Sequence, residues 1–346
     1  MKSDVFFLPW DKLNDLGAWL KGTGLYKTIE PHQFAAIKIH FGEEGNKGFI
    51  KPGLVKPVVD EISANGAYPF LTDANTIYVG ARADAVHHAL TAEKHGFNIA
   101  NCGCPVIIAD GLRGNSGVDV PVKLKHFKKV SIANAMHYAD SVILMSHFKG
   151  HEITGFGGAI KNAGMGAATR AGKYAMHDKL TPKVTAEKCT GCGNCVKWCP
   201  EKALMLKDKK IVMNRAKCVG CGECTLSCKF NVFSIPWDES VGSAQEKIAE
   251  YAYGVLKGKP GFSVNFVNHV TKFCDCYPDS GQPLLRDIGV FASFDPVALD
   301  QACAEAVNKE FGSDFVEHVF PGIDWKKQFI YAEKIGLGKR EYKLIK

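Results

Sequence analysis

Short continuous runs of hydrophobic residues alternate along this chain with hydrophobic stripes of helical spacing. Four runs predict buried strands, at residues 34–42, 68–72, 106–109 and 141–146. A helical stripe runs from Pro52 until Asn65-Gly66 closes the helix, and residues 82–95 predict a further helix before the third strand. Strand, polar turn, helix and strand thus recur at the spacing of a parallel sheet covered by helices.

The flanking segments extend this pattern. Residues 11–30 predict a short helix and a turn, and the alternation of hydrophobic and polar residues at 122–130 predicts an edge strand. Past Trp237 the pattern predicts a helix, two strands and then a helix after Asp295-Pro296, the first three at residues 243–257, 263–267 and 287–292.

The predicted fold class is α/β, with a doubly wound, mainly parallel sheet. Two late strands could not bury their faces alone. We therefore expect residues 1–183 and 239–346 to form the two parts of one α/β host domain. Residues 184–238, which are rich in cysteine, would interrupt it as an inserted two-cluster ferredoxin domain.

Polar residues follow the predicted strands, where open α/β sheets bind their ligands. Lys38 and His40 end the first strand, with Glu43 and Asn46 in the loop beyond, and Asp73 ends the second. A histidine at a strand end is as compatible with a structural hydrogen bond as with a ligand site. We treat Lys38, His40 and Asp73 as candidate cofactor-binding residues.

The fourth strand leads into a glycine-rich loop, residues 146–166, that enters a helix. The start of a helix favours an anion, so the loop predicts a site for an anionic cofactor or small ligand. A crowded strand-helix crossing is the alternative, but crowding would explain only the glycines. The loop supplies the candidate catalytic residues His147, His151 and Lys161 and the candidate cofactor-binding residues Gly157, Gly158 and Asn162.

Eight of the thirteen cysteines form two runs of equal spacing. The first is Cys189-x-x-Cys192-x-x-Cys195-x-x-x-Cys199-Pro200, and the second is Cys218-x-x-Cys221-x-x-Cys224-x-x-x-Cys228. Such runs hold iron-sulfur cubes, and the distal cysteine of each run ligates the cluster of the other. Structural zinc is the competing interpretation of Cys-x-x-Cys pairs. Two fourfold runs, the first closed by proline, favour two 4Fe-4S clusters, although Lys229 replaces the second proline.

The predicted ligand sets are therefore crossed between the runs. Cluster one takes Cys189, Cys192, Cys195 and Cys228, and cluster two takes Cys218, Cys221, Cys224 and Cys199.

Three further features bear on chemistry. Cys274 and Cys276 could ligate an additional metal ion, a third site to which His177, followed by Asp178, could contribute. Isolated cysteine pairs are also often merely buried, and Cys102-x-Cys104 raises the same ambiguity. Asp295 and Asp300 have structural interpretations, as a helix cap and a helix-face acid.

The net charge of +7 is scattered, without basic runs interleaved with aromatic residues, so no nucleic-acid partner is predicted. Residues 184–238 contain nine Lys/Arg and five Asp/Glu, which partly offsets the negative charge of two clusters and suits contact with the host domain or an acidic redox partner protein. The apolar run that ends at Pro9 is too short for a membrane span or a signal peptide. Low-potential clusters need reducing, oxygen-poor surroundings, so we expect a cytoplasmic protein of an anaerobe.

These motifs together resemble the family catalogued as domain of unknown function 362. The resemblance rests on Lys38-Ile-His-Phe-Gly-Glu, on Ser146-His-Phe-Lys-Gly-His through Gly158-Ala-Ile-Lys-Asn, on Cys274-Asp-Cys and on Asp295-Pro-Val-Ala-Leu-Asp300. It covers essentially the whole chain and implies an inserted two-cluster ferredoxin, but no reaction.

A weaker resemblance is to nickel-pincer lactate racemases. His151, the turn from Gly155 to Gly158, Lys161 and His177 follow the order of that family's histidine, glycine turn, cofactor-bearing lysine and metal-binding histidine. The resemblance implies proton transfer by His151, cofactor attachment or an anion contact at Lys161, and a metal ligand at His177. The family's other catalytic histidine has no clear match here, and racemases of that type lack a ferredoxin.

The first functional hypothesis is an iron-sulfur oxidoreductase or electron-transfer protein. Two clusters would relay electrons between a redox partner and a pocket lined by Lys38, His40, Asp73, His147, His151 and Lys161. The alternatives are a non-redox, nickel-pincer-like isomerase or racemase, and a maturation protein that binds a metal or cofactor.

Overall fold

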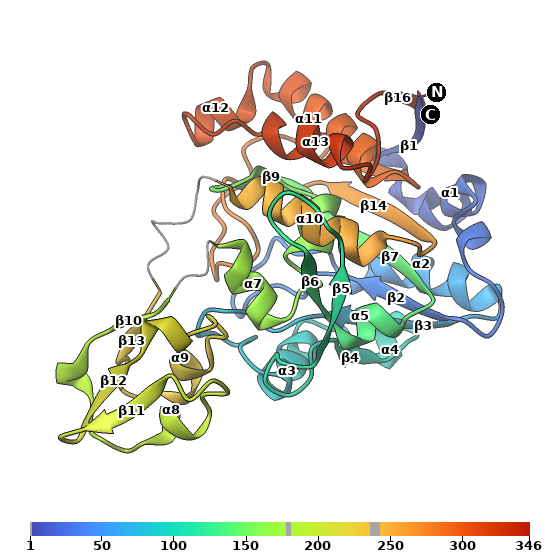
Figure 1. Ribbon diagram of the computed structural model, residues 1–346. Helices are drawn as coiled ribbons and strands as arrows, with labels where there is room; N and C mark the ends of the chain where they lie inside the picture. Colours follow the sequence, from blue (N-terminus) through green and yellow to red (C-terminus); the bar gives the residue numbers. More distant parts are fainter. Residues whose placement is uncertain (1, 178–180, 236–242) are drawn as a thin grey trace.

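The computed structural model describes residues 2–177, 181–235 and 243–346 (Figure 1). Its centre is a sheet in the order β16-β1-β15-β14-β7-β2-β3-β4. The strands are β1 (Ser3–Pro9), β2 (Phe34–Lys38), β3 (Tyr68–Asp73), β4 (Val106–Ile108), β7 (Ser141–His147), β14 (Gly261–Val267), β15 (Gly289–Ser293) and β16 (Tyr342–Ile345). Only β15 runs against the other strands of this sheet. The predicted α/β fold with a mainly parallel sheet is confirmed, and the sheet is mixed.

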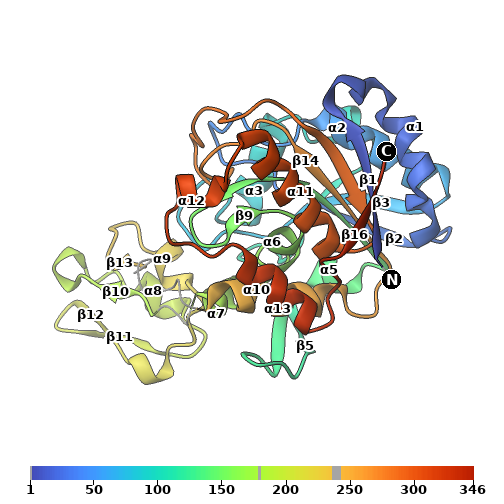
Figure 2. The same cartoon turned by 90° about the horizontal axis from the view of Figure 1, so that it is seen from above.

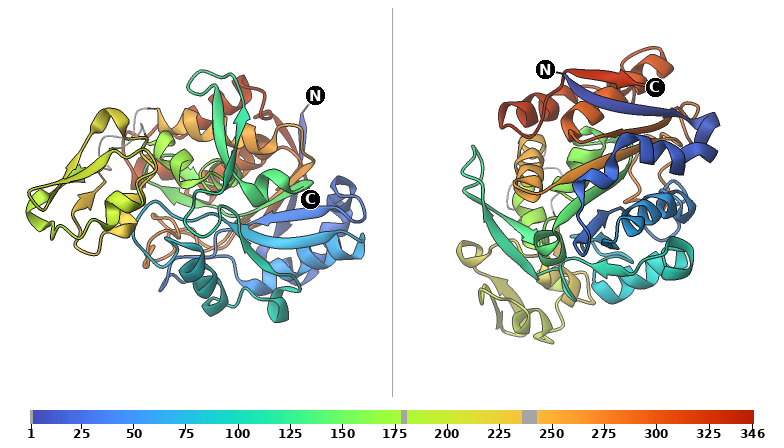
Figure 3. Two further views of the ribbon diagram at one scale, coloured as in Figure 1. Left: turned by 60° about the horizontal axis from the view of Figure 1, so that its bottom comes forward. Right: turned by 90° about the vertical axis from the view of Figure 1, so that its right-hand side faces the viewer.

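Helices cover both faces of the sheet (Figure 3), and buried hydrophobic side chains form a core on each face. Along β7, Val142 and Leu144 face one core, and Ile143 and Met145 face the other, as the alternation of a strand requires. One core takes α1 (Leu16–Thr23), α2 (Pro52–Ala64), α3 (Ala85–Lys94) and α4 (Ile99–Cys102). The other takes α5 (Asn134–Tyr138), α6 (Ala159–Gly164), α7 (Arg170–Met176), α10 (Ala244–Leu256), α11 (Pro296–Phe311), α12 (Phe315–Val319) and α13 (Lys326–Lys334).

Strands from both sides of the cysteine-rich segment share this sheet. β14 pairs with β7, and β1 lies between β15 and β16, so the two chain ends are neighbours (Figure 2). The late strands thus bury their faces by joining the early ones. The expected domain boundary at residue 238 lies outside the described residues.

The predicted edge strand at 122–130 is wrong. The structure instead has a hairpin of β5 (Gly117–Pro121) and β6 (Lys129–Ala133), and the intervening residues form its turn. Lys123 adopts a positive φ there, and the amides of His126 and Phe127 donate to the Glu250 carboxylate on α10. The alternating pattern therefore reflects a loop packed on a helix and not a strand.

The cysteine-rich segment forms a small lobe beside the sheet (Figure 1). β10 (Lys183–Val184) pairs with β13 (Phe233–Ser234), and β11 (Leu204–Lys207) pairs with β12 (Lys210–Met213). Two short helices, α8 (Asn194–Lys197) and α9 (Glu223–Ser227), complete it. Its hydrophobic core is small and contains cysteine side chains, in contrast to the two cores of the host.

Candidate functional site

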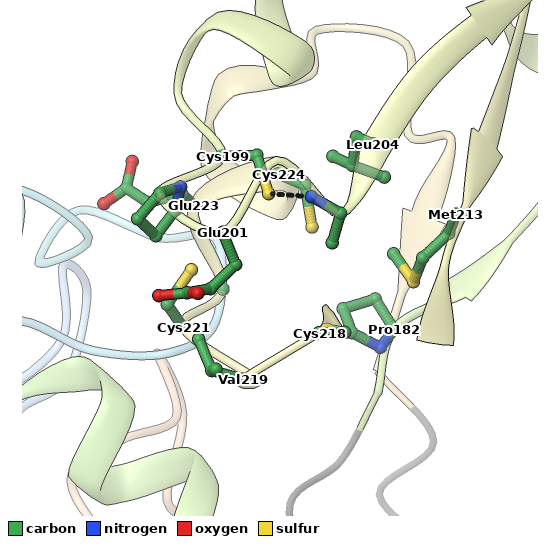
Figure 4. A pocket seen from close by; sticks show the side chains of 13 residues that line it. Pro182, Cys199, Glu201, Leu204, Met213, Cys218, Val219, Cys221, Glu223 and Cys224 are labelled. Atoms are coloured by element: carbon green, nitrogen blue, oxygen red, sulfur yellow. Dashed lines mark hydrogen bonds between the residues drawn. The ribbon is translucent and has the colours of Figure 1, made fainter. Parts of the chain in front are cut away.

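The inserted lobe contains two hollows, each lined by four cysteines. One is lined by Cys199, Cys218, Cys221 and Cys224 (Figure 4). The other is lined by Cys189, Cys192, Cys195 and Cys228. The empty space around the cysteines is similar, about 360 and 300 Å³, and includes open solvent at the mouth of each hollow. Each hollow combines three cysteines of one run with the distal cysteine of the other, which is the grouping that crossed ligation requires.

The backbone around the hollows suits a cofactor that carries negative charge. Gly191, Gly193, Gly220 and Gly222 have positive φ angles, so the chain winds tightly around each side. The amide of Gly191 donates to Cys189 Sγ over 3.4 Å, and that of Ala203 donates to Cys199 Sγ over 3.2 Å (Figure 4). Four soft sulfur donors and nearby amides fit a 4Fe-4S cluster in each hollow.

Burial disfavours the free thiolate form of several of these sulfurs. It raises the pKa of Cys195 to about 11, and it raises the pKa of Cys221 and Cys224 as well. A thiolate in such surroundings needs positive charge beside it. Iron would supply that charge directly.

The hollow lined by Cys199, Cys218, Cys221 and Cys224, the Cys199 hollow, lies against the host domain. The buried carboxylate of Glu223, at the start of α9, accepts from Arg170 at 3.2 Å, from Arg113 at 3.0 Å and from Asn115 at 2.8 Å. The Arg113 guanidinium also stacks on Trp198 of the insert, 3.7 Å from the ring centre. These host contacts meet the insert beside Cys221 and Cys224.

An aromatic residue extends this contact into the host. Any side chain at Gly222 would overlap the ring of Tyr174 on α7, so backbone and ring are in close contact. The Tyr174 hydroxyl donates to the carbonyl of Ile77 over 3.2 Å. Ile77 precedes Tyr78, whose hydroxyl is hydrogen-bonded to Arg82. A continuous line of contacts therefore joins the Cys199 hollow to the loop after β3.

Buried ion pairs hold the carboxyl ends of β2 and β3 together. Lys38 Nζ lies 2.9 Å from Asp73 Oδ1 and donates to Asn162 Oδ1 over 2.8 Å. Arg82 pairs with Asp73 at 3.4 Å and with Glu43 at 3.2 Å. Although burial alone would raise it, the pKa of Asp73 lies well below its ordinary value, because Lys38 and its other cationic neighbours favour the carboxylate.

Cys274, Asp275 and Cys276 form a turn that reaches this edge of the sheet. The amide of Tyr277 donates to the Cys274 carbonyl over 3.2 Å, and the amide of Cys276 donates to Cys274 Sγ over 3.4 Å. The two side chains are close enough to shift each other's pKa. The Glu43 amide donates to the Asp275 carbonyl over 2.9 Å, which fixes the turn against the loop after β2.

His40 lies beside Cys276, with Nε2 3.5 Å from Sγ. The His40 Nδ1 accepts the Gly42 amide over 3.0 Å, so the neutral ring carries its proton on Nε2 and directs it at the sulfur. The hydrogen bond from Cys274 holds the pKa of Cys276 well below its usual range, and Lys161 and His40 act in the same direction. His40 therefore favours the thiolate at Cys276 over that at Cys274.

His147 and Lys149 anchor Asp275. The carboxylate lies 3.0 Å from His147 Nδ1 and 2.7 Å from Lys149 Nζ, and His147 Nε2 lies 2.7 Å from the Asn268 carbonyl. Both ring nitrogens of His147 therefore have partners. Its geometry fits a residue that positions the Cys-Asp-Cys turn.

The start of α6 has an internal anion. The buried carboxylate of Asp300 accepts from the amides of Ala159 at 2.7 Å and Ile160 at 2.9 Å. A side chain at Gly158 would overlap this carboxylate. Asp300 thus occupies the helix start that the sequence offers to an external anion, and crowding accounts for Gly158. Gly157 has no such crowding, because a side chain there would meet Lys161 and Lys149 only at ordinary contact distances.

Lys161 and His151 lie on the same side as the Cys-Asp-Cys turn. Burial opposes the charge of Lys161, but Cys274 and Cys276 raise its pKa, so it is an ammonium group. Burial holds the pKa of His151 well below its usual range, and the positive charge of Lys161 lowers it further. His151 Nδ1 accepts the amides of Ile153 and Thr154, while Nε2 lies 3.9 Å from Glu152 Oε2. His151 is therefore a neutral imidazole.

His177 lies near Lys161, and burial lowers its pKa to about 4. Asp178, its expected partner, lies outside the described residues. Within the described part of the chain, no three Cys, His, Asp or Glu side chains converge on a single metal ion, and the cysteines that line each hollow are spaced more widely than that. The nearest imidazole contact of Cys276 that the structure records is with His40.

Residues 35–305 match the family model described as Domain of unknown function (DUF362). The chain belongs to the DUF362 family. No curated protein matches the DUF362 chain. Within its described residues, no helix has both the length and the hydrophobicity to span a bilayer.

Two solved structures resemble the DUF362 chain at low identity. The lactate racemase apoprotein from Thermoanaerobacterium thermosaccharolyticum is 12% identical, with a TM-score of 0.43 over 90% of this chain and 58% of that one. A structural-genomics protein from Thermotoga maritima is 9% identical, with a TM-score of 0.44 over 89% of this chain and 61% of that one. The DUF362 chain spans about three fifths of either structure.

Sequence reasoning missed several members of this site in the DUF362 chain. Arg82 was only a helix start in the pattern, although it is fully buried between two carboxylates. Tyr174 and Arg170 belonged to an unremarkable polar helix, yet they meet the insert. Asp275 carried a signal, because it stands between two cysteines. No local pattern marks the other three.

Proposed function

We propose that this protein is an iron-sulfur oxidoreductase or electron-transfer protein. The observation that carries the proposal is the pair of hollows, each lined by three cysteines of one run and the distal cysteine of the other. Cys189, Cys192, Cys195 and Cys228 would hold cluster one, and Cys218, Cys221, Cys224 and Cys199 would hold cluster two. Each cluster, when bound, stores and passes one electron.

Contacts between the insert and the host indicate which cluster would lie nearer to the host site. The Cys199 hollow is fixed against the host by Glu223, Arg170 and Tyr174. The line of contacts through Ile77 continues to Tyr78, beside the buried polar site. We therefore assign the Cys199 hollow as the inner station and the Cys189 hollow as the outer one, nearer to a redox partner.

The charge of the insert suggests the kind of redox partner. Its nine basic residues outnumber its five acidic ones, so an acidic electron carrier suits the outer station. The reducing setting that such clusters need supports a cytoplasmic location.

Anaerobic purification with metal analysis and intact mass tests the proposal. The relay predicts about eight iron atoms per chain, an unchanged polypeptide mass and an absorbance that a reductant bleaches reversibly. Zinc in place of iron would contradict it. Nickel, or added mass on Lys161, would instead support the nickel-pincer-like isomerase.

A further inference from the structure

Cys274 and Cys276 form a second kind of redox centre in the host. We propose that they are a dithiol/disulfide couple that takes up two electrons, which arrive one at a time through the clusters of the insert. This inference rests on the proposed function, because the clusters supply the electrons. It adds a group in the host that collects two electrons from carriers that each transfer one.

The turn places the two cysteines on either side of Asp275, and backbone hydrogen bonds close it. The Tyr277 amide closes the turn on the Cys274 carbonyl over 3.2 Å, and the Cys276 amide donates to Cys274 Sγ over 3.4 Å. Short separation of the sulfurs is the first requirement for a disulfide. The Asp275 carboxylate, held by His147 and Lys149, keeps the turn in place while the S–S bond forms and breaks.

The surroundings suit a reactive sulfur and not a passive one. Cys276 faces the Nε2 proton of His40 at 3.5 Å, and Lys161 places a positive charge near both sulfurs. Neighbouring cations favour the thiolate, which is the form that enters disulfide exchange. A passive pair would be surrounded by hydrocarbon.

The chemical step balances with groups named on the chain. A low-potential one-electron donor reduces the protein twice, once for each cluster. Two electrons then enter the S–S bond, which breaks. Cys274 takes up one proton and becomes a thiol, while Cys276 remains a thiolate opposite His40 and Lys161. The reverse reaction delivers two electrons to an oxidised substrate, and the nearby cations favour a substrate with negative charge.

The position of the pair also suits the relay. The contact line from the Cys199 hollow reaches Tyr78, and it continues through Arg82 and Glu43 to the Asp275 carbonyl between the two cysteines. The couple is therefore next to the host end of that line.

The host contains a matched control pair with the same spacing. Cys102 and Cys104 are buried in the apolar core, and burial raises the pKa of Cys104 to about 12. Trypsin separates the two pairs, because residues 273–286 contain Cys274 and Cys276 and residues 95–113 contain Cys102 and Cys104, with no other cysteine in either peptide.

An anaerobic reductive titration of the holoprotein tests the couple. The protein is oxidised with thionine, freed of the dye and titrated with dithionite. The wild type should take four electron equivalents per chain, Cys276→Ser should take two, and Cys104→Ser should take four. A wild type that holds its full iron but takes only two equivalents would overturn the couple and leave the proposed function intact. Absence of iron would instead overturn the proposed function.

A second measurement needs no variant. Alkylation of the denatured oxidised protein should leave Cys274 and Cys276 unmodified in a peptide that is two mass units lighter than its dithiol form, while Cys102 and Cys104 are alkylated. After reduction, both pairs should be alkylated. Full alkylation of Cys274 and Cys276 after oxidation would contradict the proposal, and so would zinc or nickel bound in addition to the cluster iron.

Discussion

The cysteine-rich insert and the host site are built in opposite ways. The insert collects its eight sulfurs from a short stretch of chain, around a small core that itself includes cysteine. The host site joins residues that lie far apart in sequence, such as His40 and Cys276, and buried ion pairs hold it on a large sheet. The insert should therefore depend on its metal, and the host site on its charges.

Removal of iron should give the largest difference between the two regions. A lobe with so small a core lacks the buried area to fold alone, so loss of the clusters should unfold it. The host sheet should stay folded. Hydrogen exchange after anaerobic chelation would show this as loss of amide protection at residues 189–228 with retained protection in β2 and β7. Equal loss in both regions would contradict the contrast.

Substitution of a buried charge should have the next largest effect, and only in the host. Lys38→Met leaves Asp73 buried without its closest cation, which should lower the free energy of unfolding by about 3 kcal/mol. Lys56→Met, in the exposed pair with Asp60, should change it by less than about 0.5 kcal/mol. Anaerobic urea unfolding measures both. Equal losses of unfolding free energy would contradict the claim that the buried Lys38–Asp73 pair stabilises the host more than an exposed pair does.

Acid should weaken the host through His88. Burial lowers the pKa of this histidine from 6.5 to about 4 in the folded protein. Its contribution is therefore complete above pH 6.5 and is lost as the pH falls towards 4, because the unfolded chain binds the proton more readily. Between pH 7 and pH 5 the loss should be about 2 kcal/mol, at 1.36 kcal/mol for each pKa unit.

The neighbouring residue provides the control for this pH dependence. His88→Gln should flatten the change in unfolding free energy between pH 7 and pH 5. His87→Gln, on the exposed side of the same helix, should leave it unchanged. Identical profiles for wild type and His88→Gln would exclude the buried histidine as its source.

A substitution at the contact between insert and host should have the smallest effect on the free energy of unfolding. Arg113→Ala removes the stacking on Trp198 and one of three partners of Glu223, and Arg170 remains. We expect a loss of about 1 kcal/mol in unfolding free energy, with full iron content. Arg215→Ala, an exposed position in the insert, should have no measurable effect. Loss of iron in Arg113→Ala would mean that docking and cluster binding are coupled.

The insert could be predicted further from sequence than the host site could. Its cysteine spacing is local, and the two hollows group the sulfurs as that spacing predicts. The central strands were predictable as well, because strands buried on both faces have continuous apolar runs, as in β7. The direction of β15 was not, since an apolar run does not state which way a strand points.

Contacts between distant segments account for the other gaps. No pattern near Asp300 states that it meets the amides of α6, and none near Cys276 states that it meets His40. The turn at 122–130 has an alternating sequence, but three successive residues of it, Lys125, His126 and Phe127, contact α10. These features depend on packing between elements, which a one-dimensional pattern does not contain.

The crossed ligation of the two hollows is tested most directly by alkylation of native Cys199→Ala under anaerobic conditions. Crossed ligation predicts that Cys218, Cys221 and Cys224 become labelled, while Cys189, Cys192, Cys195 and Cys228 stay protected by the remaining cluster. Iron should fall by about half, because one of two equal clusters is lost. Labelling of Cys189, Cys192 and Cys195 with protection of the whole second run would contradict the arrangement.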